Sequence, residues 1–211
     1  MNVALIGLSG AGKSAVAPLL AGRLGFECVD LDREIEGLGG AAVAAIFDER
    51  GEAAFREIES HALAVALAPG GPDIDASPGG DGPTGRVVAC GGGVLGSARN
   101  RDLLKRRAWV VWLRVEPAVA ALRLGKGAQT GRAGAEGGAG ARSAARAEAR
   151  PLLRGGPLEE RLGSLLEARA QAYAEAADVA VDTRDRTIEE VADAIVPLWE
   201  THRARWGSSG S

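Results

Sequence analysis

The sequence predicts an α/β fold of three layers, α/β/α, with a central five-stranded parallel sheet. Short apolar runs typical of buried strands alternate along the chain with longer stretches of helical character. The first of these runs leads directly into a glycine-rich loop and then into a helix. The chain has 211 residues, of which 46% are hydrophobic and 25% charged, enough for one domain with a sizeable core.

Five apolar runs are predicted to be the strands of this sheet. They are Val3–Ile6, Glu27–Val29, Arg86–Ala89, Trp109–Leu113 and Val179–Val181. The stretches around them are predicted to be helices. These are Ser14–Leu24, Asp32–Leu38, Ala42–Glu49, Glu52–Leu67, Ser97–Arg106, Pro117–Leu124, Leu158–Ala176 and Ile188–Thr201. Because strands and helices alternate, we expect parallel strands whose two faces are covered by helices.

Two segments interrupt this alternation. Residues 69–85 are rich in Gly, Pro, Asp and Ser and are predicted to form a solvated loop insert. Residues 125–149 consist mostly of Gly, Ala and Arg and are too long for an ordinary connection. We therefore expect a mobile lid, a disordered insert or both within residues 124–157. Residues 207–211 are predicted to be a flexible tail, which leaves a single domain over residues 1–206.

Composition and charge limit the classes of function. With 25 Lys and Arg against 28 Asp and Glu, the formal net charge is −3, which argues against binding to a nucleic-acid backbone. The two cysteines, Cys28 and Cys90, suggest neither a disulfide framework nor a metal cluster. We expect both to be small buried residues in a reducing compartment. No signal peptide or membrane-spanning run is evident, so we expect a cytoplasmic protein without a membrane partner.

The first strand leads into G-L-S-G-A-G-K-S at residues 7–14, which matches the phosphate-binding pattern G-x-x-x-x-G-K-S. The glycines let backbone N–H groups surround a polyphosphate, and the N-terminus of the next helix favours the anion. Lys13 can reach the β- and γ-phosphates, and the Ser14 hydroxyl can ligate Mg²⁺. A chance glycine-rich turn is the alternative. The order of strand, loop and helix favours a site for a nucleoside triphosphate and Mg²⁺.

Two aspartates follow the second strand, where open α/β sheets bind their ligands. Asp30 and Asp32 are two residues apart, so in an extended segment both side chains would point the same way. A phosphotransferase needs one carboxylate near Mg²⁺ and another that orients or deprotonates the attacking hydroxyl. The pair could divide these roles. Alternatively, Asp32 is the N-cap of the helix that follows, and the sequence does not separate the two interpretations.

Two further features concern the acceptor of the phosphoryl group. Arg56 lies four residues after Glu52 and three before Glu59, the spacing of exposed ion pairs on a helix. The alternative is an arginine turned into the cleft, where its guanidinium would hold an acid by two hydrogen bonds. Residues 91–93 are three glycines directly after the third strand, which would let a ligand approach the backbone closely.

Taken in order, these motifs resemble the shikimate kinase family, in the nucleoside-monophosphate-kinase-like group of P-loop NTPase folds. The resemblance covers nearly the whole chain. Beyond the phosphate loop it rests on D-L-D at 30–32 with Glu34-Ile35-Glu36, Ile46-Phe47, G-E-A-A-F-R-E-I-E at 51–59, G-G-G at 91–93, Arg150-Pro151-Leu152-Leu153, Arg169 with Tyr173, Ala177-Asp178 and Val181-Asp182-Thr183. Each of these is weak alone, whereas together and in this order they are specific.

The resemblance implies a reaction and its catalytic residues. The family transfers the γ-phosphoryl group of ATP, with Mg²⁺, to the 3-hydroxyl of shikimate. The products are shikimate 3-phosphate and ADP, a step of chorismate and aromatic amino-acid biosynthesis. On the family pattern, Lys13 contacts the phosphates and Asp32 is the base. Arg150, in the lid, would neutralise charge on the transferring phosphoryl group.

The same pattern implies the remaining site residues. The expected nucleotide-binding residues are Gly10, Ala11, Gly12, Lys13, Ser14, Ala15, Arg123, Arg150 and Arg186. The expected shikimate-binding residues are Asp32, Arg56, Gly91, Gly92, Gly93 and Arg169. The two arginines Arg56 and Arg169 would hold the carboxylate, and the Gly92 backbone would bind a ring hydroxyl. The expected Mg²⁺ ligands are Ser14 and, through water, Asp30.

The chain departs from the family pattern in three respects. Ala15 stands where the family usually has Thr, and Ala89 where it often has a small hydroxyl residue near Mg²⁺. Contacts to the phosphates and the metal could therefore be altered. The Gly/Ala-rich segment before Arg150 makes the lid longer than usual, which the slow growth of loop-closure entropy should tolerate.

Two other functions stay open at this point. One is another small-metabolite kinase of the same fold, such as a gluconate kinase, and the other is a nucleotide-binding module whose catalysis has lapsed. The resemblance also implies a monomer whose partner is the small molecule shikimate. Outside the site, Trp109 and Trp112 are expected in the core and His61 on the surface or half-buried.

Overall fold

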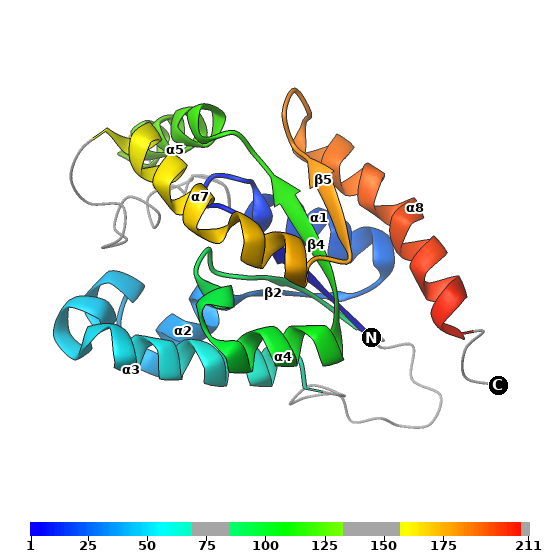
Figure 1. Ribbon diagram of the computed structural model, residues 1–211, viewed down its shortest axis with the longest axis horizontal. Coiled ribbons are helices and arrows are strands. Elements are labelled where there is room, and N and C mark those ends of the chain that lie inside the picture. Colours follow the sequence, from blue (N-terminus) through cyan, green and yellow to red (C-terminus); the bar gives the residue numbers. More distant parts are fainter. Residues whose placement is uncertain (69–84, 133–156, 208–211) are drawn as a thin grey trace.

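The computed structural model describes residues 1–68, 85–132 and 157–207 and has the predicted three-layer α/β/α arrangement (Figure 1). The strands are β1 (Asn2–Ile6), β2 (Glu27–Asp30), β3 (Arg86–Ala89), β4 (Ala108–Arg114) and β5 (Val179–Asp182). All pair in parallel and form one sheet in the order β2-β3-β1-β4-β5. The helices of the described residues are α1 (Lys13–Leu24), α2 (Leu31–Gly39), α3 (Val43–Ala66), α4 (Ala98–Arg107), α5 (Pro117–Arg132), α7 (Leu158–Ala176) and α8 (Ile188–Gly207), with a short 3₁₀ helix η1 (Val94–Gly96).

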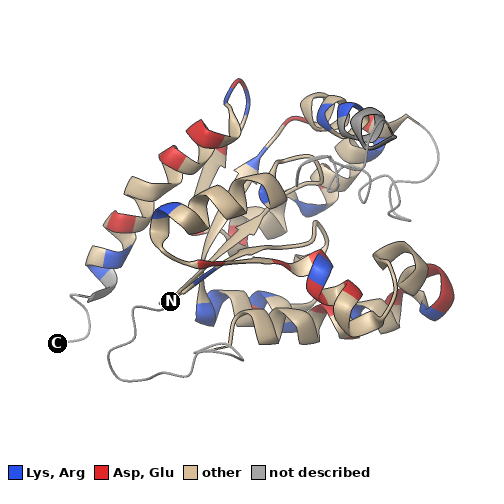
Figure 2. Cartoon of the chain, turned by 180° about the vertical axis from the view of Figure 1, so that it is seen from behind, with Lys and Arg blue, Asp and Glu red and all other residues tan. Residues whose placement is uncertain are grey.

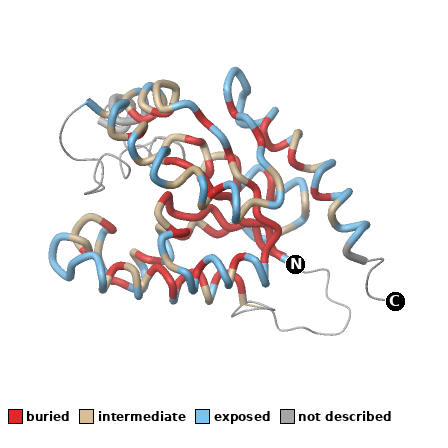
Figure 3. The backbone as a smooth tube through the Cα atoms, in the orientation of Figure 1, coloured by how far each residue is buried: buried red, intermediate tan, exposed pale blue. Residues whose placement is uncertain are grey.

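Helices cover both faces of the sheet, and alternate residues of each strand contribute to two separate cores. On β1, Val3 and Leu5 belong to the core shared with α1 and α8, whereas Ala4 and Ile6 belong to the core shared with α3 and α4. Every residue of β1 is buried, as the tube view shows for the centre of the molecule (Figure 3). A strand buried on both faces explains the almost continuous apolar run in the sequence.

The strand order determines which end of the sheet can bind a ligand. β2 follows β1 in the chain, yet β3 lies between them in the sheet. The register pairs Ala89 with Leu5 on one side and with Asp30 on the other. The loops that follow β1, β2 and β3 therefore leave the sheet side by side at its carboxyl edge, where open α/β sheets bind ligands. This brings the phosphate loop, the aspartates and the glycine triplet (residues 91–93) together.

The predicted strands agree with the observed ones to within one residue at each end. The two helices predicted over 42–49 and 52–67 are joined in α3 across a kink at Gly51, whose φ is 79°. The predicted end of the helix over Pro117–Leu124 is wrong, because residues 125–132 continue α5. α5 packs on α7, and a helix already begun extends easily despite its glycines. The rest of the predicted lid and insert, residues 133–156 and 69–84, lies outside the described residues.

Acidic and basic residues are distributed over helices on both faces of the sheet (Figure 2). α4 ends in Lys105, Arg106 and Arg107, where positive charge stabilises the carbonyl end of a helix. Within the described segments, no helix combines the length and the apolar character that a membrane crossing requires.

A buried arginine ties together three elements at the amino end of the sheet. The Nε of Arg86 donates a hydrogen bond of 2.7 Å to a Glu27 carboxylate oxygen on β2. Its Nη1 donates to the carbonyl oxygens of Val65 and Ala66, at 3.1 and 3.3 Å, which lie in the last turn of α3. The side chain of Asn2 accepts from the Arg86 backbone N–H at 3.1 Å. Arg86 thus gives the Ala66 carbonyl a donor and adds a second one to the Val65 carbonyl, which also accepts from the Ala68 N–H at 3.1 Å.

We predict that Arg86→Ala lowers the free energy of unfolding by about 1–3 kcal/mol, because it leaves the buried Ala66 carbonyl without this donor and breaks the ion pair with Glu27. Urea unfolding measures the change. The matched control is Arg23→Ala, which breaks an ion pair of 2.9 Å with Asp193, a side chain that is 65% exposed. That pair should contribute less than about 1 kcal/mol. Equal losses in the two variants would contradict the role given to Arg86.

Candidate active site

The loop between β1 and α1 forms a cradle that depends on glycine. Gly10 and Gly12 have φ values of 83° and 93°, in the left-handed region that side chains disfavour. A Cβ on Gly10 would lie 2.8 Å from the carbonyl oxygen of Ala120. The Ala11 N–H donates to the Leu8 carbonyl at 3.2 Å, and α1 begins at its first residue, Lys13, without a side-chain cap. Its N-terminal N–H groups thus face the loop, as an anion site requires.

Lys13 lies folded over this cradle. Its side chain is buried, and Nζ donates to the carbonyl oxygens of Gly7 and Leu8 at 2.8 and 2.9 Å. Ser14 and Ala15 follow in the first turn of α1. The cradle, the helix N-terminus and the ammonium group fit a polyphosphate, as the sequence predicted.

The structure corrects the interpretation of the two aspartates. β2 ends at Asp30, and Asp32 lies in the first turn of α2, so the two are not on one extended segment. Asp30, and not Asp32, is the N-cap: its Oδ1 accepts from the Asp32 N–H at 3.1 Å. This leaves the Asp32 carboxylate directed at Gly91, where a Cβ would lie 3.2 Å from Asp32 Oδ1 and 3.3 Å from Glu59 Oε1. Asp32 and Glu59 therefore meet at the glycine triplet.

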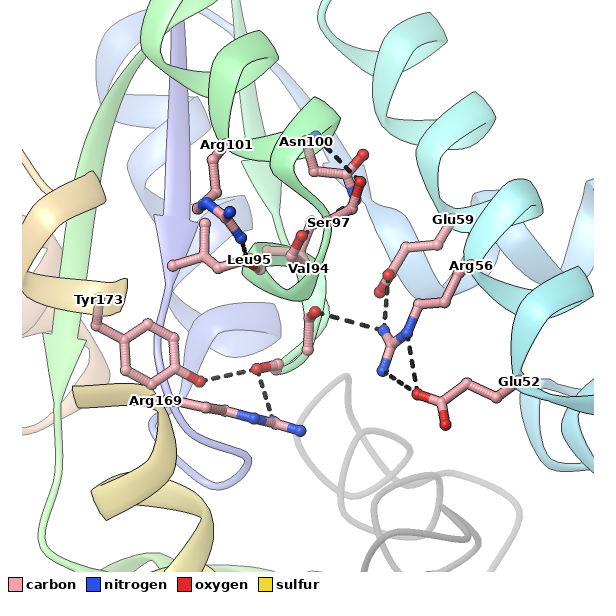
Figure 4. A network of polar contacts seen from close by, with 12 residues as sticks. Glu52, Arg56, Glu59, Val94, Leu95, Ser97, Asn100, Arg101, Arg169 and Tyr173 are labelled. Atoms are coloured by element: carbon pink, nitrogen blue, oxygen red, sulfur yellow. Dashed lines mark hydrogen bonds and ion pairs between the residues drawn. The ribbon is translucent and has the colours of Figure 1, made fainter. Parts of the chain in front are cut away.

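Arg56 makes the predicted ion pairs on α3 and also reaches the glycine triplet, so the two interpretations are not alternatives (Figure 4). Nη1 donates to Glu59 Oε2 at 2.7 Å and to the Gly93 carbonyl at 3.4 Å. Nη2 and Nε both face Glu52 Oε1, at 3.2 and 3.4 Å. Burial lowers the pKa of Arg56, but the two carboxylates outweigh it and the pKa is raised. The ion pair of Arg56 and Glu59 is not an exposed surface pair, because the Glu59 side chain is only 2% exposed.

Arg169 approaches the triplet from the opposite side, on α7 (Figure 4). Its Nη1 donates to the Gly92 carbonyl at 2.9 Å, and the Tyr173 hydroxyl donates to the same oxygen at 2.8 Å. Tyr173 is buried and stacks on Trp112, with ring centroids 5.6 Å apart. The two predicted acid-binding arginines, 113 residues apart in the sequence, thus meet at one stretch of backbone.

Sequence reasoning did not single out Glu59 or Tyr173 as parts of the site. Glu59 was counted only as an ion-pair partner, and Tyr173 only as part of a motif. Their spacing was the available signal: Glu59 lies one helical turn after Arg56, and Tyr173 one turn after Arg169.

The residues expected near the adenine lie around the loop between β5 and α8. Arg123 donates to the hydroxyl and the carbonyl oxygen of Thr183, at 3.0 and 2.7 Å. Arg186 is exposed in the same loop, in which Asp185 has a φ of 54°. Arg150, the expected lid arginine, lies outside the described residues.

The sequence also predicted the burial of three side chains outside the expected site. Trp109 is buried and packs on Trp199, as expected of a core residue. Trp112 is partly buried and touches the site through Tyr173. His61 is exposed, in agreement with the sequence.

The cysteines differ from each other, and the expectation that both are buried is wrong for Cys28. Cys28 is exposed on β2, an edge strand of the sheet, whereas Cys90 is buried just after β3. Burial raises the pKa of the Cys90 thiol to about 12; the positive charge of Lys13 opposes this rise, and the carboxylates of Glu59, Asp32 and Asp30 add to it. The thiol thus lies among the charges of the phosphate loop and the acceptor end.

No group of three or more His, Cys, Asp or Glu residues in the described chain could hold a metal ion. Mg²⁺ is commonly bound through one or two protein groups together with substrate phosphates. The Ser14 hydroxyl and the Asp30 carboxylate, whose Oδ1 is engaged as the cap, fit that kind of donor set.

Comparison with known proteins identifies similar chains. A family model described as shikimate kinase matches residues 9–199. A shikimate kinase from Symbiobacterium thermophilum is 37% identical over 93% of this chain and 94% of its own length. One from Geobacter sulfurreducens is 36% identical over 96% of this chain and 92% of its own. Among solved structures, a shikimate kinase from Acinetobacter baumannii in complex with shikimate is similar, with a TM-score of 0.74, 29% identity and coverage of 95% of this chain and 93% of that one.

We predict that Cys90 does not react with a disulfide reagent such as Ellman's reagent in the folded protein. A thiol with a pKa near 12 holds roughly one part in ten thousand as thiolate at pH 8, and this fraction grows tenfold per pH unit. One equivalent, from Cys28, should react before unfolding and a second only in guanidinium chloride. Cys28→Ser is the control and should show no reactive thiol until it unfolds. Rapid reaction of the folded variant would contradict the burial of Cys90.

Proposed function

The chain belongs to the shikimate kinase family, and we propose that its site transfers the γ-phosphoryl group of ATP to the 3-hydroxyl of shikimate. The observation that carries this proposal is the convergence of Arg56 and Arg169 on the glycine triplet, beside Asp32 and next to the phosphate loop. A small acid with ring hydroxyls needs two cations at one end and a carboxylate near the reacting oxygen. Both are present at the carboxyl edge of the sheet.

On the donor side, the phosphate loop binds ATP. Backbone N–H groups around Gly10, Ala11 and Gly12 hold the phosphates, and Lys13 moves from the carbonyls of its own loop onto phosphate oxygens. Ser14 and, through water, Asp30 would hold Mg²⁺, which would offset charge on the phosphates during transfer. Ala15 borders the phosphates in the first turn of α1, where its backbone N–H also donates to the Gly12 carbonyl at 3.0 Å.

On the acceptor side, Arg56 and Arg169 bind the shikimate carboxylate. The Gly92 carbonyl already accepts two hydrogen bonds, so we assign the ring hydroxyl to backbone N–H groups of the triplet. The oxygen of the 3-hydroxyl bonds to the γ-phosphorus, and the bond between the γ-phosphorus and the bridging oxygen of ADP breaks. Asp32 accepts the proton that the 3-hydroxyl loses. The products are shikimate 3-phosphate and ADP.

Three further arginines complete the proposed site. Arg123, which the Thr183 contacts hold in place, and Arg186 border the adenine. Arg150 neutralises charge on the transferring group when the lid within residues 124–157 closes.

We also propose that residues 1–206 act as a single-domain monomer in the cytoplasm, with ATP and shikimate as partners and neither nucleic acid nor a membrane. The single sheet, which joins both ends of the chain in one core, supports one domain. The two free thiols, Cys28 and Cys90, support a reducing compartment. The net charge of −3 supports the absence of a nucleic-acid partner.

We predict that ATP is consumed with shikimate but not with gluconate or nucleoside monophosphates. The arrangement of Arg56, Arg169 and Asp32 around a glycine triplet suits a compact ring acid. A coupled assay of ADP release with each acceptor in turn measures the selectivity. Equal turnover with gluconate would favour a gluconate kinase, and no turnover with any acceptor would favour a lapsed nucleotide-binding module.

We predict opposite kinetic effects for two arginines. Arg150→Ala should lower kcat by roughly 10³-fold and leave the Kd for shikimate nearly unchanged, because the lid arginine acts on the transferring group. Arg56→Ala should raise the Kd by roughly 30-fold or more, because it removes one of the two cations proposed to hold the acid and takes the guanidinium away from the buried Glu59 carboxylate. Steady-state kinetics measures the effect on kcat, and calorimetry measures the effect on the Kd for shikimate. Arg203→Ala, an exposed arginine of α8, is the control. Normal turnover in Arg150→Ala would move the lid role to another arginine.

A further inference from the structure

The guanidinium of Arg56 is engaged on both of its edges before any substrate is present. On one side, Nη1 donates to Glu59 Oε2 at 2.7 Å and to the Gly93 carbonyl at 3.4 Å. On the other, the edge formed by Nε and Nη2 lies against a single oxygen of Glu52, at 3.4 and 3.2 Å. These contacts use four of the five N–H groups of the guanidinium.

A substrate carboxylate that binds Arg56 with two parallel hydrogen bonds needs two N–H groups on one edge. One free N–H does not provide such an edge. An incoming carboxylate must therefore displace Glu59, Glu52 or the Gly93 carbonyl. The Gly93 carbonyl is part of the backbone and cannot swing away, so one of the two glutamates has to give way.

The two glutamates differ in how strongly they bind Arg56. Glu59 is 2% exposed and makes the short contact of 2.7 Å, so releasing it would leave a buried charge without its cation. Glu52 is 58% exposed, and its contacts are longer. An exposed pair at i,i+4 spacing contributes little, because water and salt screen it. Glu52 is the partner that can leave.

The fold gives the displaced carboxylate a second stabilising environment. Glu52 follows directly after the kink at Gly51 and so stands at the start of the continuing part of α3. A carboxylate near the N-terminus of a helical segment is favoured by the helix dipole. Glu52 can thus leave Arg56 without losing all of its electrostatic stabilisation.

We propose that Glu52 occupies the substrate-binding edge of Arg56 in the empty site and is displaced by the carboxylate of the substrate. This inference rests on the proposed function. Glu52 acts as a competitor for the acid: it weakens binding of every ligand that must displace it. A ligand that cannot form two parallel hydrogen bonds with Arg56 gains no interaction that compensates for the displacement of Glu52. Glu52 is therefore a specificity-determining residue that does not itself bind the substrate.

The test is calorimetric titration of shikimate, and of its methyl ester, into the full chain without nucleotide. Glu52→Gln removes the competing charge, so the Kd for shikimate should fall by roughly threefold to tenfold. The Kd for the ester, which lacks the carboxylate, should stay unchanged. Glu57→Gln is the matched control, because it removes the same charge from an exposed position next to Arg56 in the sequence. It should leave both values unchanged.

Arg56→Ala in the same titrations distinguishes failure of this inference from failure of the proposed function. If Arg56→Ala loses shikimate binding and Glu52→Gln binds the acid no more tightly than the parent chain, the displacement of Glu52 is overturned while the function stands. Equal gains for acid and ester would also overturn it. If the parent chain binds no shikimate, the proposed function and this inference both fall.

Discussion

The acceptor end of this molecule depends on the absence of side chains at the glycine triplet. A Cβ on Gly93 would lie 2.9 Å from the nearest nitrogen of the Arg56 guanidinium, and one on Gly91 would lie 3.2 Å from the Asp32 carboxylate. Between them, the carbonyl of Gly92 accepts the hydrogen bonds of Arg169 and of Tyr173. Three helices, α2, α3 and α7, can therefore bring charged groups to one stretch of backbone after β3. A side chain in the triplet would push the guanidinium away, and the helices would no longer share a centre.

The buried ion pair of Arg56 and Glu59 is better understood as a positioning device than as a source of stability. Removing two charges from water costs more than most pairs regain by mutual attraction. The pair nevertheless fixes the guanidinium in one orientation, with Nη1 held and the opposite edge facing Glu52. The same crowding of carboxylates contributes to the high pKa of Cys90, after the dominant effect of burial. The charges at this site are thus held in place by the fold before the substrate arrives.

How much of this could be predicted from the sequence depends on the range of the interactions. The strands and the phosphate loop follow from local patterns, the apolar runs and the G-x-x-x-x-G-K-S spacing, and both agree with the structure. The roles of Asp30 and Asp32 depend on where β2 ends and α2 begins, and the structure places the cap on Asp30, two residues before the position considered for it. Glu59 and Tyr173 were not predicted as site residues, because the orientation of their side chains follows from how α3 and α7 pack beside β3. The helix over Pro117–Leu124 was predicted too short, because a helix already begun extends through glycines that the sequence pattern treats as an end.

Three cations of the proposed site differ in what each would exchange on ligand binding. On the proposed function, Lys13 would leave two neutral carbonyls for charged phosphate oxygens, and Arg169, which holds a neutral carbonyl, would gain a charged carboxylate. Hydrogen bonds to charged acceptors are about twice as strong as those to neutral ones, so both exchanges favour binding. Arg56 would exchange the Glu52 carboxylate for that of the ligand, which adds less net affinity and demands a ligand with the right paired geometry. On this argument Arg56 contributes selectivity beyond that of Lys13 and Arg169, and it keeps its pair with the buried Glu59 when the ligand binds.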